Sequence, residues 1–310
     1  MSDTQQLPLF ATLDERILNR QSALVNAVEP FQRYLRREGK TQNTIKGFSS
    51  DLHLMCQFFG DENPIGSLST RDLNRFLDWL EHGRGQPCSR KSYARRVTTI
   101  KVFFKWLKQE KIRQDNPSLA VLQRSGPAPL QPVLPPSDLH ALLDFTNELR
   151  FAEKPDPRPD VLVRLLLDTG IKKSECMSIT REDIDRSSVK EPVLMVRHRS
   201  RQNIYKERRI PLDVEWLDVL DEYLAQYKPP REIFDCTARN LEYVLRDISI
   251  AAGVEGKVSF EILRWTSAVR DYLHGMDMDA LREKMGLSRV SWRETGEKIT
   301  RLAQRQSKKM

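Results

Sequence analysis

The first third of the chain has apolar residues spaced three and four positions apart, the pattern of helices with one buried face. Residues 41–60 show it most clearly, with one face formed by Ile45, Phe48, Leu52, Met55 and Phe59. Gly60 follows this run and can end the helix. The same spacing predicts three further helices, in residues 30–40, 69–83 and 89–111. These helices together predict a small all-α domain at this end of the chain.

The pattern changes in the middle of the chain. Six prolines lie between Pro117 and Pro136 without helical spacing, which predicts an extended linker and a domain boundary. Farther on, the runs 192–198 and 207–212 predict two strands of an antiparallel hairpin, joined by the basic turn 199–206. Helical spacing returns in residues 138–145, 158–170, 213–227, 238–253 and 262–275.

The predicted fold class is therefore mainly α. An N-terminal four-helix domain precedes a mixed α+β domain with a small antiparallel sheet. The predicted boundaries are a polar tail in 1–21, the helical domain in 22–118, the proline-rich linker in 119–134, the second domain in 135–300 and a basic tail in 301–310.

The helix predicted for residues 89–111 carries a dense set of cations, and we expect these to lie outside its apolar stripe: Arg90, Lys91, Arg95, Arg96, Lys101, Lys105 and Lys108. A solvated basic face is one interpretation, and a surface that lies against DNA is the other. We favour DNA, because the charge is dense and of nearly one sign.

Composition narrows the function classes. Lys and Arg exceed Asp and Glu by eight, which modestly favours a polyanionic partner. The four cysteines form no CxxC pair, so we expect neither a metal site nor a disulfide framework, and no cofactor. The sequence shows neither an apolar run of membrane-spanning length nor a signal peptide. We expect a cytoplasmic, nucleoid-associated protein with no membrane partner.

Several segments of the chain resemble the tyrosine recombinases, also called the phage integrase family. The segment LLLDTGIKKSECMSITREDID is similar to the family's Thr-Gly-Leu-Arg-x-Ser-Glu box, KERRIPL to its hairpin strand and ILRWTSA to its second arginine box. The N-terminal half resembles the family's SAM-like core-binding domain, with matches at Thr41, Thr44, Asp51, Leu52, Asn116 and Pro117. The resemblance covers residues 22–296 and implies the fold already predicted.

The family's chemistry tells which side chains to look for. A tyrosine hydroxyl attacks a DNA phosphate and forms a 3′-phosphotyrosyl link. Two arginines clamp the non-bridging oxygens, a hairpin lysine protonates the leaving 5′ oxygen, and histidine-type positions donate hydrogen bonds. Guanidinium suits the clamp because its fork matches two oxygens at once.

Carried over residue by residue, most of these positions differ from the family pattern. The first arginine falls on Lys172, and the hairpin lysine falls on Lys206, with Arg201 as the basic alternative. The second arginine is present as Arg264. The histidine-type positions fall on Glu261, Trp265 and Leu287, and the nucleophilic tyrosine falls on Gly296.

No tyrosine lies near the expected nucleophile position, since the last one in the chain is Tyr272. We expect Tyr272 to pack in the core. Tyr205 on the hairpin and Ser288 are weaker alternatives as nucleophiles. The substitutions imply a catalytically degenerate member of the family, and we therefore expect the protein not to be an enzyme.

The resemblance also implies a set of DNA contacts. We expect them from Thr41, Asn43, Lys46, Arg90, Lys91, Arg95, Arg96, Arg181, Arg199, Arg201, Lys206, Arg239, Arg246 and Arg264. Most would touch phosphates, with Asn43, Arg90 and Lys91 as candidates for base edges. Two interpretations stay open for Arg264: a phosphate ligand, or an ion-pair partner of a carboxylate such as Glu261.

Three functions follow. The first is a duplex DNA-binding protein that assists or regulates recombination, integration or transposition of a mobile element, with an active recombinase or transposase in trans. The others are an atypical site-specific recombinase and a protein–protein adaptor. The family also exchanges a C-terminal helix between protomers, and Ile299, Leu302 and Trp292 could form such a patch in a homo-oligomer on DNA.

Overall fold

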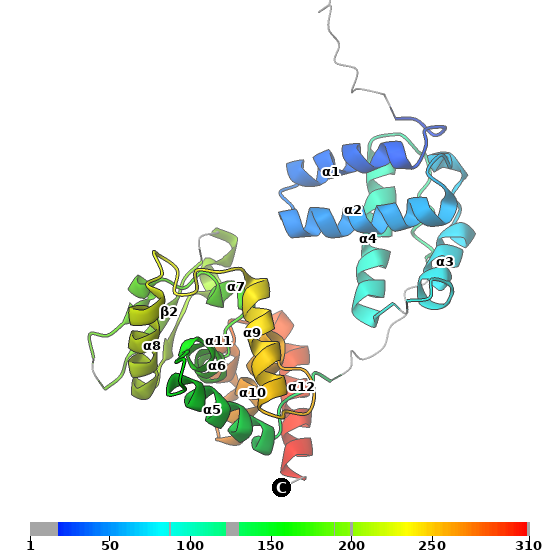
Figure 1. Cartoon of the computed structure of the whole chain (residues 1–310). Coiled ribbons are helices and arrows are strands. Elements are labelled where there is room, and N and C mark those ends of the chain that lie inside the picture. Colours follow the sequence, from blue (N-terminus) through cyan, green and yellow to red (C-terminus); the bar gives the residue numbers. More distant parts are fainter. Residues whose placement is uncertain (1–17, 87, 122–129, 189, 199–200, 309–310) are drawn as a thin grey trace, which may run out of the picture. The chain divides into compact units, whose positions relative to one another are not determined.

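The computed structural model describes residues 18–86, 88–121, 130–188, 190–198 and 201–308. The chain divides into two compact units, residues 1–128 and 129–310 (Figure 1). Each unit has a hydrophobic core of its own. Residues 1–17 of the predicted tail 1–21 lie outside the described residues. Residues 122–129 of the predicted linker 119–134 also lie outside them.

Unit 1 contains the four predicted helices: α1 (Val28–Arg37), α2 (Gln42–Phe59), α3 (Thr70–Asp78) and α4 (Arg90–Gln109). Two 3-10 turns, η1 (Val25–Ala27) and η2 (Ile65–Ser67), complete it, and α3 continues into a π-helical turn, η3 (Trp79–Gly83). Figure 1 shows α1 and α2 side by side, with α4 running across them. The predicted all-α domain is confirmed.

Side-chain caps fix where these helices begin. The Thr41 hydroxyl accepts a hydrogen bond from the backbone N–H of Thr44 at the start of α2. Ser69 and Asp72 form a reciprocal capping box at the start of α3. The core between the helices is aromatic, with Phe31 edge-on to Phe103 at 5.2 Å between ring centroids.

Unit 2 contains one small antiparallel sheet in the order β1 (Ile184–Asp185), β2 (Val193–Val196), β3 (Arg208–Pro211). The β2–β3 hairpin was predicted, and its register pairs buried Leu194 with buried Ile210. The connection holds a 3-10 turn, η5 (Arg201–Lys206). Strand β1 has two residues, too few for a pattern that could have predicted it.

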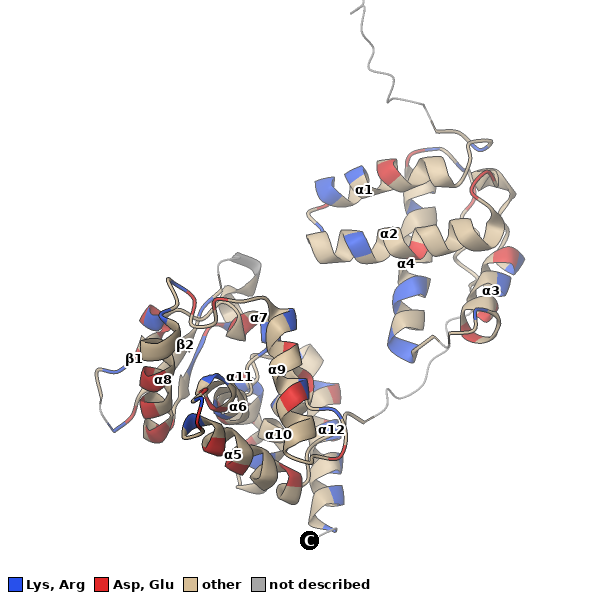
Figure 2. Ribbon diagram, viewed as in Figure 1, with Lys and Arg blue, Asp and Glu red and all other residues tan. Residues whose placement is uncertain are grey.

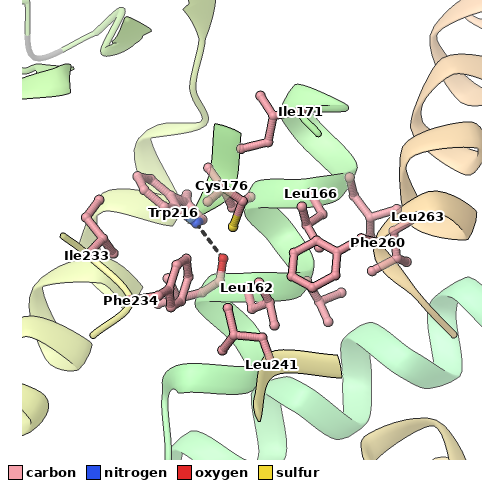
Figure 3. Close-up of a cluster of buried hydrophobic side chains, with 14 of the residues drawn as sticks. Leu162, Leu166, Ile171, Cys176, Trp216, Ile233, Phe234, Leu241, Phe260 and Leu263 are labelled. Atoms are coloured by element: carbon pink, nitrogen blue, oxygen red, sulfur yellow. Dashed lines mark hydrogen bonds between the residues drawn. The ribbon is translucent and has the colours of Figure 1, made fainter. Parts of the chain in front are cut away.

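The helices of unit 2 are α5 (Pro136–Arg150), α6 (Arg158–Thr169), α7 (Lys173–Cys176), α8 (Val214–Tyr227), α9 (Ala238–Ala251), α10 (Phe260–Leu273), α11 (Met278–Lys284) and α12 (Arg289–Ser307), with a 3-10 turn η4 (Arg181–Asp183) before β1. Helix α6 is buried on nearly all sides. Figure 3 shows Leu162 and Leu166 of α6 packed among Phe260, Leu263 and Leu241. The Trp216 indole donates to the Val161 carbonyl oxygen at 3.0 Å, which satisfies its one polar atom in the core.

A second core cluster of unit 2 joins α10, α11 and α12. Ile299 and Leu302 of α12 are buried here against Ala268 and Leu281. The predicted exchange patch is therefore packed within its own chain. Helix α12 runs on to Ser307, so the boundary predicted at residue 300 falls inside a helix, because the apolar spacing continues through Ala303.

None of the helices in the described part of the chain combines the length and the apolar character that crossing a bilayer requires.

Candidate functional site

Lys172, which we expect at the position of the family's first arginine, stands at the start of the short helix α7. Its backbone N–H donates to the Glu175 carboxylate at 2.8 Å, the contact that starts this turn. Its ammonium donates to the Gly286 carbonyl oxygen at 3.1 Å and lies 3.7 Å from Glu175. Burial lowers the pKa of Lys172; Glu175 opposes this, and the cations Arg264, Arg208 and Lys206 add to it. The ammonium is a single charge in a partly desolvated, cationic setting.

Glu175 is the buried anion of this site. Arg208 of β3 grips both of its carboxylate oxygens, at 3.1 and 2.9 Å. Burial acts to raise the pKa of Glu175, but the hydrogen bonds and charge of Arg208, followed by the backbone N–H and charge of Lys172, outweigh it and hold the pKa at about 2. His198 Nε2 is 3.5 Å from the same carboxylate. Three cationic or potentially cationic groups thus surround one carboxylate, and Arg208 has the closest grip.

Gly286 lets Arg208 reach this position. A Cβ at Gly286 would lie 2.6 Å from an Arg208 guanidinium nitrogen, and the glycine has φ +59°. Arg208 Nε also donates to the Lys284 carbonyl oxygen at 2.7 Å. The segments around residues 172, 208 and 286, far apart in sequence, therefore meet through one guanidinium.

Arg264 is fixed by backbone carbonyls. One of its terminal nitrogens donates to the Gly170 carbonyl oxygen and the other to that of Met285, the latter at 2.6 Å. Burial lowers its pKa to about 10, although Glu175 opposes this shift. Arg264 and Glu261, both described, form no ion pair with each other. The ion-pair interpretation of Arg264 does not hold with Glu261 as the partner, because Glu261 is exposed whereas Arg264 is buried.

A cavity of about 1030 Å³ opens beside these residues, between α7, η4 and the hairpin. Lys172, Arg181, His198 and Lys206 are among its lining residues. Lys206 donates to Asn203 at 2.6 Å and lies 5.2 Å from the centre of the Tyr205 ring. Arg181 donates to the Pro229 carbonyl oxygen at 3.1 Å. Lys172 thus offers an ammonium to an anion in a cavity whose lining also contains the acids Glu182, Asp183, Glu207 and Glu232.

The other positions carried over from the family lie apart from this cavity. Trp265, Leu287 and Tyr272 pack against the α10–α12 cluster, and that packing is what we expected of Tyr272. Gly296 is buried in α12, where a Cβ would lie 3.0 Å from Met278 Cε. Ser288 caps α12 by accepting from the Ser291 N–H. Tyr205 is 66% exposed on η5.

The expected DNA contacts of unit 1 divide into exposed and engaged residues. Thr41, Asn43, Lys46, Arg90 and Lys91 are exposed at the starts of α2 and α4. Figure 2 shows cations on both helices. Arg95 instead reaches across to α2, donating to the Gly47 carbonyl oxygen and pairing with Asp51, both at 2.9 Å.

Arg96 corrects the prediction that all the cations of this helix lie outside its apolar stripe. It is 8% exposed, lies 3.5 Å from Asp51 and donates to the Cys88 sulfur. Its spacing from Tyr93 and Ile100 places it on the buried face, and Asp51 supplies the charge that makes this tolerable. Burial raises the pKa of Asp51, while the Thr99 hydrogen bond and the two arginines oppose the shift.

Two more expected contacts, Arg239 and Arg246, flank the exposed ring of Tyr243 on α9. Arg239 donates to the Tyr243 hydroxyl at 2.7 Å, and the Arg246 guanidinium lies 4.8 Å from the ring centre. Arg199 and the Arg201 side chain lie outside the described structure. Among described residues, no cluster of three or more His, Cys, Asp or Glu side chains is placed to hold a metal ion.

Comparison with known proteins sets this geometry in a family. Residues 132–294 match the model of the phage integrase family, and residues 28–111 match the phage integrase N-terminal SAM-like domain. This chain belongs to the phage integrase family. Tyrosine recombinase XerC of Anoxybacillus flavithermus is 28% identical over 280 residues, covering 84% of this chain and 89% of the relative. Tyrosine recombinase XerD of Vibrio cholerae is 23% identical over 274 residues, covering 82% and 84%.

Solved structures show the same fold. The XerH site-specific recombinase, in its complex with a palindromic difH substrate, aligns with a TM-score of 0.76 at 15% identity, over 95% of this chain and 97% of XerH. The Tn1549 transposon integrase, in complex with a circular intermediate DNA, aligns with a TM-score of 0.66 at 18% identity, over 89% of this chain and 99% of the integrase.

The family relatives overturn one expectation. We expected the protein not to be an enzyme, because its residues depart from the family pattern at several positions. The relatives that match most of this chain are named tyrosine recombinases, which are enzymes, so that expectation is contradicted.

Sequence reasoning missed the part that Arg208 plays at this site. The segment KERRIPL contains it, but its partner Glu175 lies 33 residues earlier. The signal for this role in the sequence was weak: an arginine that is buried in a short strand requires an anion nearby. Glu175 itself stood in the quoted first box as the one acidic residue of KKSEC.

Proposed function

We propose that this protein binds duplex DNA at a recombination site and holds a backbone phosphate at Lys172. It would take part in recombination, integration or transposition of a mobile element, alongside a recombinase or transposase supplied in trans. Structurally similar proteins solved with DNA support the partner: XerH is bound to a palindromic difH substrate, and the Tn1549 integrase to a circular intermediate DNA. The net charge of +8 agrees in sign with this partner.

The observation that carries the proposal is the Lys172 ammonium at the cavity. In the described structure this ammonium makes one hydrogen bond, to the Gly286 carbonyl oxygen, and a longer ion pair with Glu175 at 3.7 Å. The Lys172 side chain is 32% exposed, which leaves its charge accessible to a phosphate. A lysine binds phosphate as a point charge, without the two-oxygen fork of the family's arginine. Arg264, with both terminal nitrogens on carbonyls, would act mainly through its charge.

Unit 1 would supply most of the remaining contacts. Thr41, Asn43 and Lys46 on α2 and Arg90 and Lys91 on α4 are exposed in the helix starts, where backbone N–H groups also favour phosphate. Asn43, Arg90 and Lys91 are the proposed base-edge contacts. Arg95 and Arg96 would organise this surface through Asp51. In unit 2, Arg181, Lys206, Arg239 and Arg246 would touch phosphates from the cavity rim and from α9.

A second function, strand cleavage by an atypical nucleophile, is favoured by one observation. The phenol of Tyr205 is exposed on the hairpin, beside Lys206 and the cavity. A tyrosine hydroxyl is the family's nucleophile, and Lys206 would hold the phosphate beside it. A nicked duplex that traps covalent intermediates tests this: an SDS-stable protein–DNA adduct lost in Tyr205→Phe supports it, and an adduct that persists in Tyr205→Phe excludes it.

Salt-dependent binding tests the leading proposal. Fluorescence anisotropy with a labelled duplex, repeated across salt concentrations, gives the slope of log K against log salt. Lys172→Met should weaken binding and reduce that slope by about 0.9, the value for one neutralised phosphate. Lys154→Met, at an exposed lysine after α5, is the matched control. Equal affinities and slopes for the two variants would refute a phosphate at Lys172.

A further inference from the structure

The carboxylate of Glu175 has more cationic neighbours than it can pair with closely. Arg208 holds it by two hydrogen bonds at 2.9 and 3.1 Å, whereas Lys172 stands at 3.7 Å and His198 at 3.5 Å. Glu175 is 2% exposed and Arg208 8% exposed as side chains, so water screens this pair little. In this arrangement Arg208 makes the closest side-chain contacts with the anion, and the Lys172 ammonium stays beyond hydrogen-bond distance from it.

We propose that Arg208 is a positioning residue that keeps the Lys172 ammonium available for DNA phosphate by occupying Glu175. Arg208 does not itself meet the DNA in this inference, because its side chain is 8% exposed and its donors are taken by Glu175, Lys284 and Lys206. The inference rests on the proposed phosphate site at Lys172, and it assigns a role to a residue that contacts no phosphate there.

Without Arg208, the Lys172 ammonium at 3.7 Å is the nearest permanent cation to Glu175; His198 Nε2, at 3.5 Å, is charged only when protonated. A shift of less than 1 Å in the Lys172 ammonium would turn the 3.7 Å approach into a hydrogen bond, and the two groups are already three residues apart on one turn. A buried carboxylate left unpaired is costly, which drives this capture. The captured ammonium would then have to break an ion pair before binding a phosphate.

The geometry around Gly286 supports a dedicated place for Arg208. The missing Cβ at Gly286 leaves the space that the guanidinium fills, and the Lys284 carbonyl oxygen fixes its Nε. The same short segment supplies the Gly286 carbonyl oxygen that accepts from Lys172. Arg208 thereby holds the Glu175 carboxylate in place. It also fixes the segment whose Gly286 carbonyl oxygen orients the Lys172 ammonium.

A charge-rescue experiment separates this role from simple packing. Duplex DNA affinity is measured at about 0.15 M salt for the wild type, Arg208→Met, Glu175→Gln and the double variant. Arg208→Met should bind about tenfold more weakly, the scale of one charge-assisted contact. Adding Glu175→Gln removes the capturing charge, so the double variant should recover to within about threefold of the wild type by the same scale. A purely structural role predicts that the second substitution weakens binding further.

Two additional measurements keep the test decisive. Circular dichroism establishes that each variant is folded; if Arg208→Met is not, Arg208→Lys with and without Glu175→Gln replaces it, since one ammonium cannot grip both oxygens. Lysine ε-carbon NMR follows the Lys172 resonance, assigned by its loss in Lys172→Arg. Its pKa should rise in Arg208→Met, because a cation leaves and Glu175 turns to it, and this rise should vanish in the double variant.

The outcomes distinguish the two proposals. If Lys172→Met leaves DNA affinity unchanged, the proposed phosphate site fails and this inference fails with it. If Lys172→Met weakens binding but the double variant stays as weak as Arg208→Met, the phosphate site stands and the role of Arg208 is refuted. If the double variant regains DNA affinity while Lys172→Met stays weak, Arg208 and Lys172 compete for Glu175.

Discussion

The Asp51 carboxylate on α2 and the Arg95 guanidinium on α4 lie 2.9 Å apart, in an ion pair whose acid is buried and whose base is 40% exposed. This pair joins the two helices whose starts carry the proposed DNA contacts of unit 1, and Arg96 lies 3.5 Å from the same carboxylate. The basic face of α4 is therefore anchored by an acid from its neighbour, as well as by apolar packing.

Asp51→Asn should destabilise unit 1. The amide removes the negative charge that Arg95 and buried Arg96 face, and a buried charge without its partner is costly. Because Arg95 is partly exposed, we expect a loss of about 2 kcal/mol in the free energy of unfolding, below the value for a fully buried pair. Urea unfolding measures it. Asp78→Asn, in an exposed pair with His82, is the control and should change stability by less than about 0.5 kcal/mol.

Acid should unfold the wild type partly through Glu175. The folded pKa of about 2 lies below the ordinary value for a glutamate, so the folded state binds this proton less readily than the unfolded state. The resulting stability is present above pH 5 and is lost as the pH falls from about 5 towards 2, to a total of about 3 kcal/mol. Thermal unfolding across this range should show a flatter pH dependence for Glu175→Gln. Parallel pH profiles would show that the Arg208 pair does not control this carboxyl.

Gly286→Ala should disturb the site more than an ordinary glycine substitution. Its positive φ costs about 1 kcal/mol for an alanine, and the new Cβ would also displace the Arg208 guanidinium. We expect lower stability and weaker DNA binding in anisotropy experiments. Gly275→Ala is the matched control, since Gly275 has φ +86° with open space around the Cβ position. Equal losses in the two variants would mean that the Arg208 contact adds nothing to backbone strain.

Reversing the charges at the start of α4 should weaken DNA binding. Arg90→Glu with Lys91→Glu replaces two cations by anions beside a phosphate backbone, and we expect at least about a hundredfold loss of affinity at low salt. Lys105→Glu with Lys108→Glu makes the same change in charge at the other end of the same helix. If both double variants lose affinity equally, the effect reports net charge, and the start of α4 is not the contact surface.

Local spacing predicted the parts of this fold that repeat over several turns. Helices α2 and α4 and the β2–β3 hairpin follow from apolar positions and turn residues alone. Helix α7 has four residues and strand β1 two, so neither offers enough positions for a period to appear. Their conformations depend on contacts with distant segments, such as Arg208 on Glu175.

The site shows the same division between local and distant signals. Motif spacing placed Lys172, Arg264 and Lys206 in unit 2, although it could not tell which cations face a cavity. Arg96 lies on the buried face by spacing and was assigned to the surface because charged side chains usually lie there. Its acceptor, Asp51, is on another helix, and no pattern within α4 reveals it.

Sequencing of genomic fragments retained by the purified protein at about 0.15 M salt tests the central claim most directly. The Arg90→Glu, Lys91→Glu variant serves as the control for retention by charge alone. A recombination protein should enrich one inverted or repeated motif, lost in the control, at the ends of a mobile element. A flat profile that matches the control would contradict the claim that this chain recognises a recombination site.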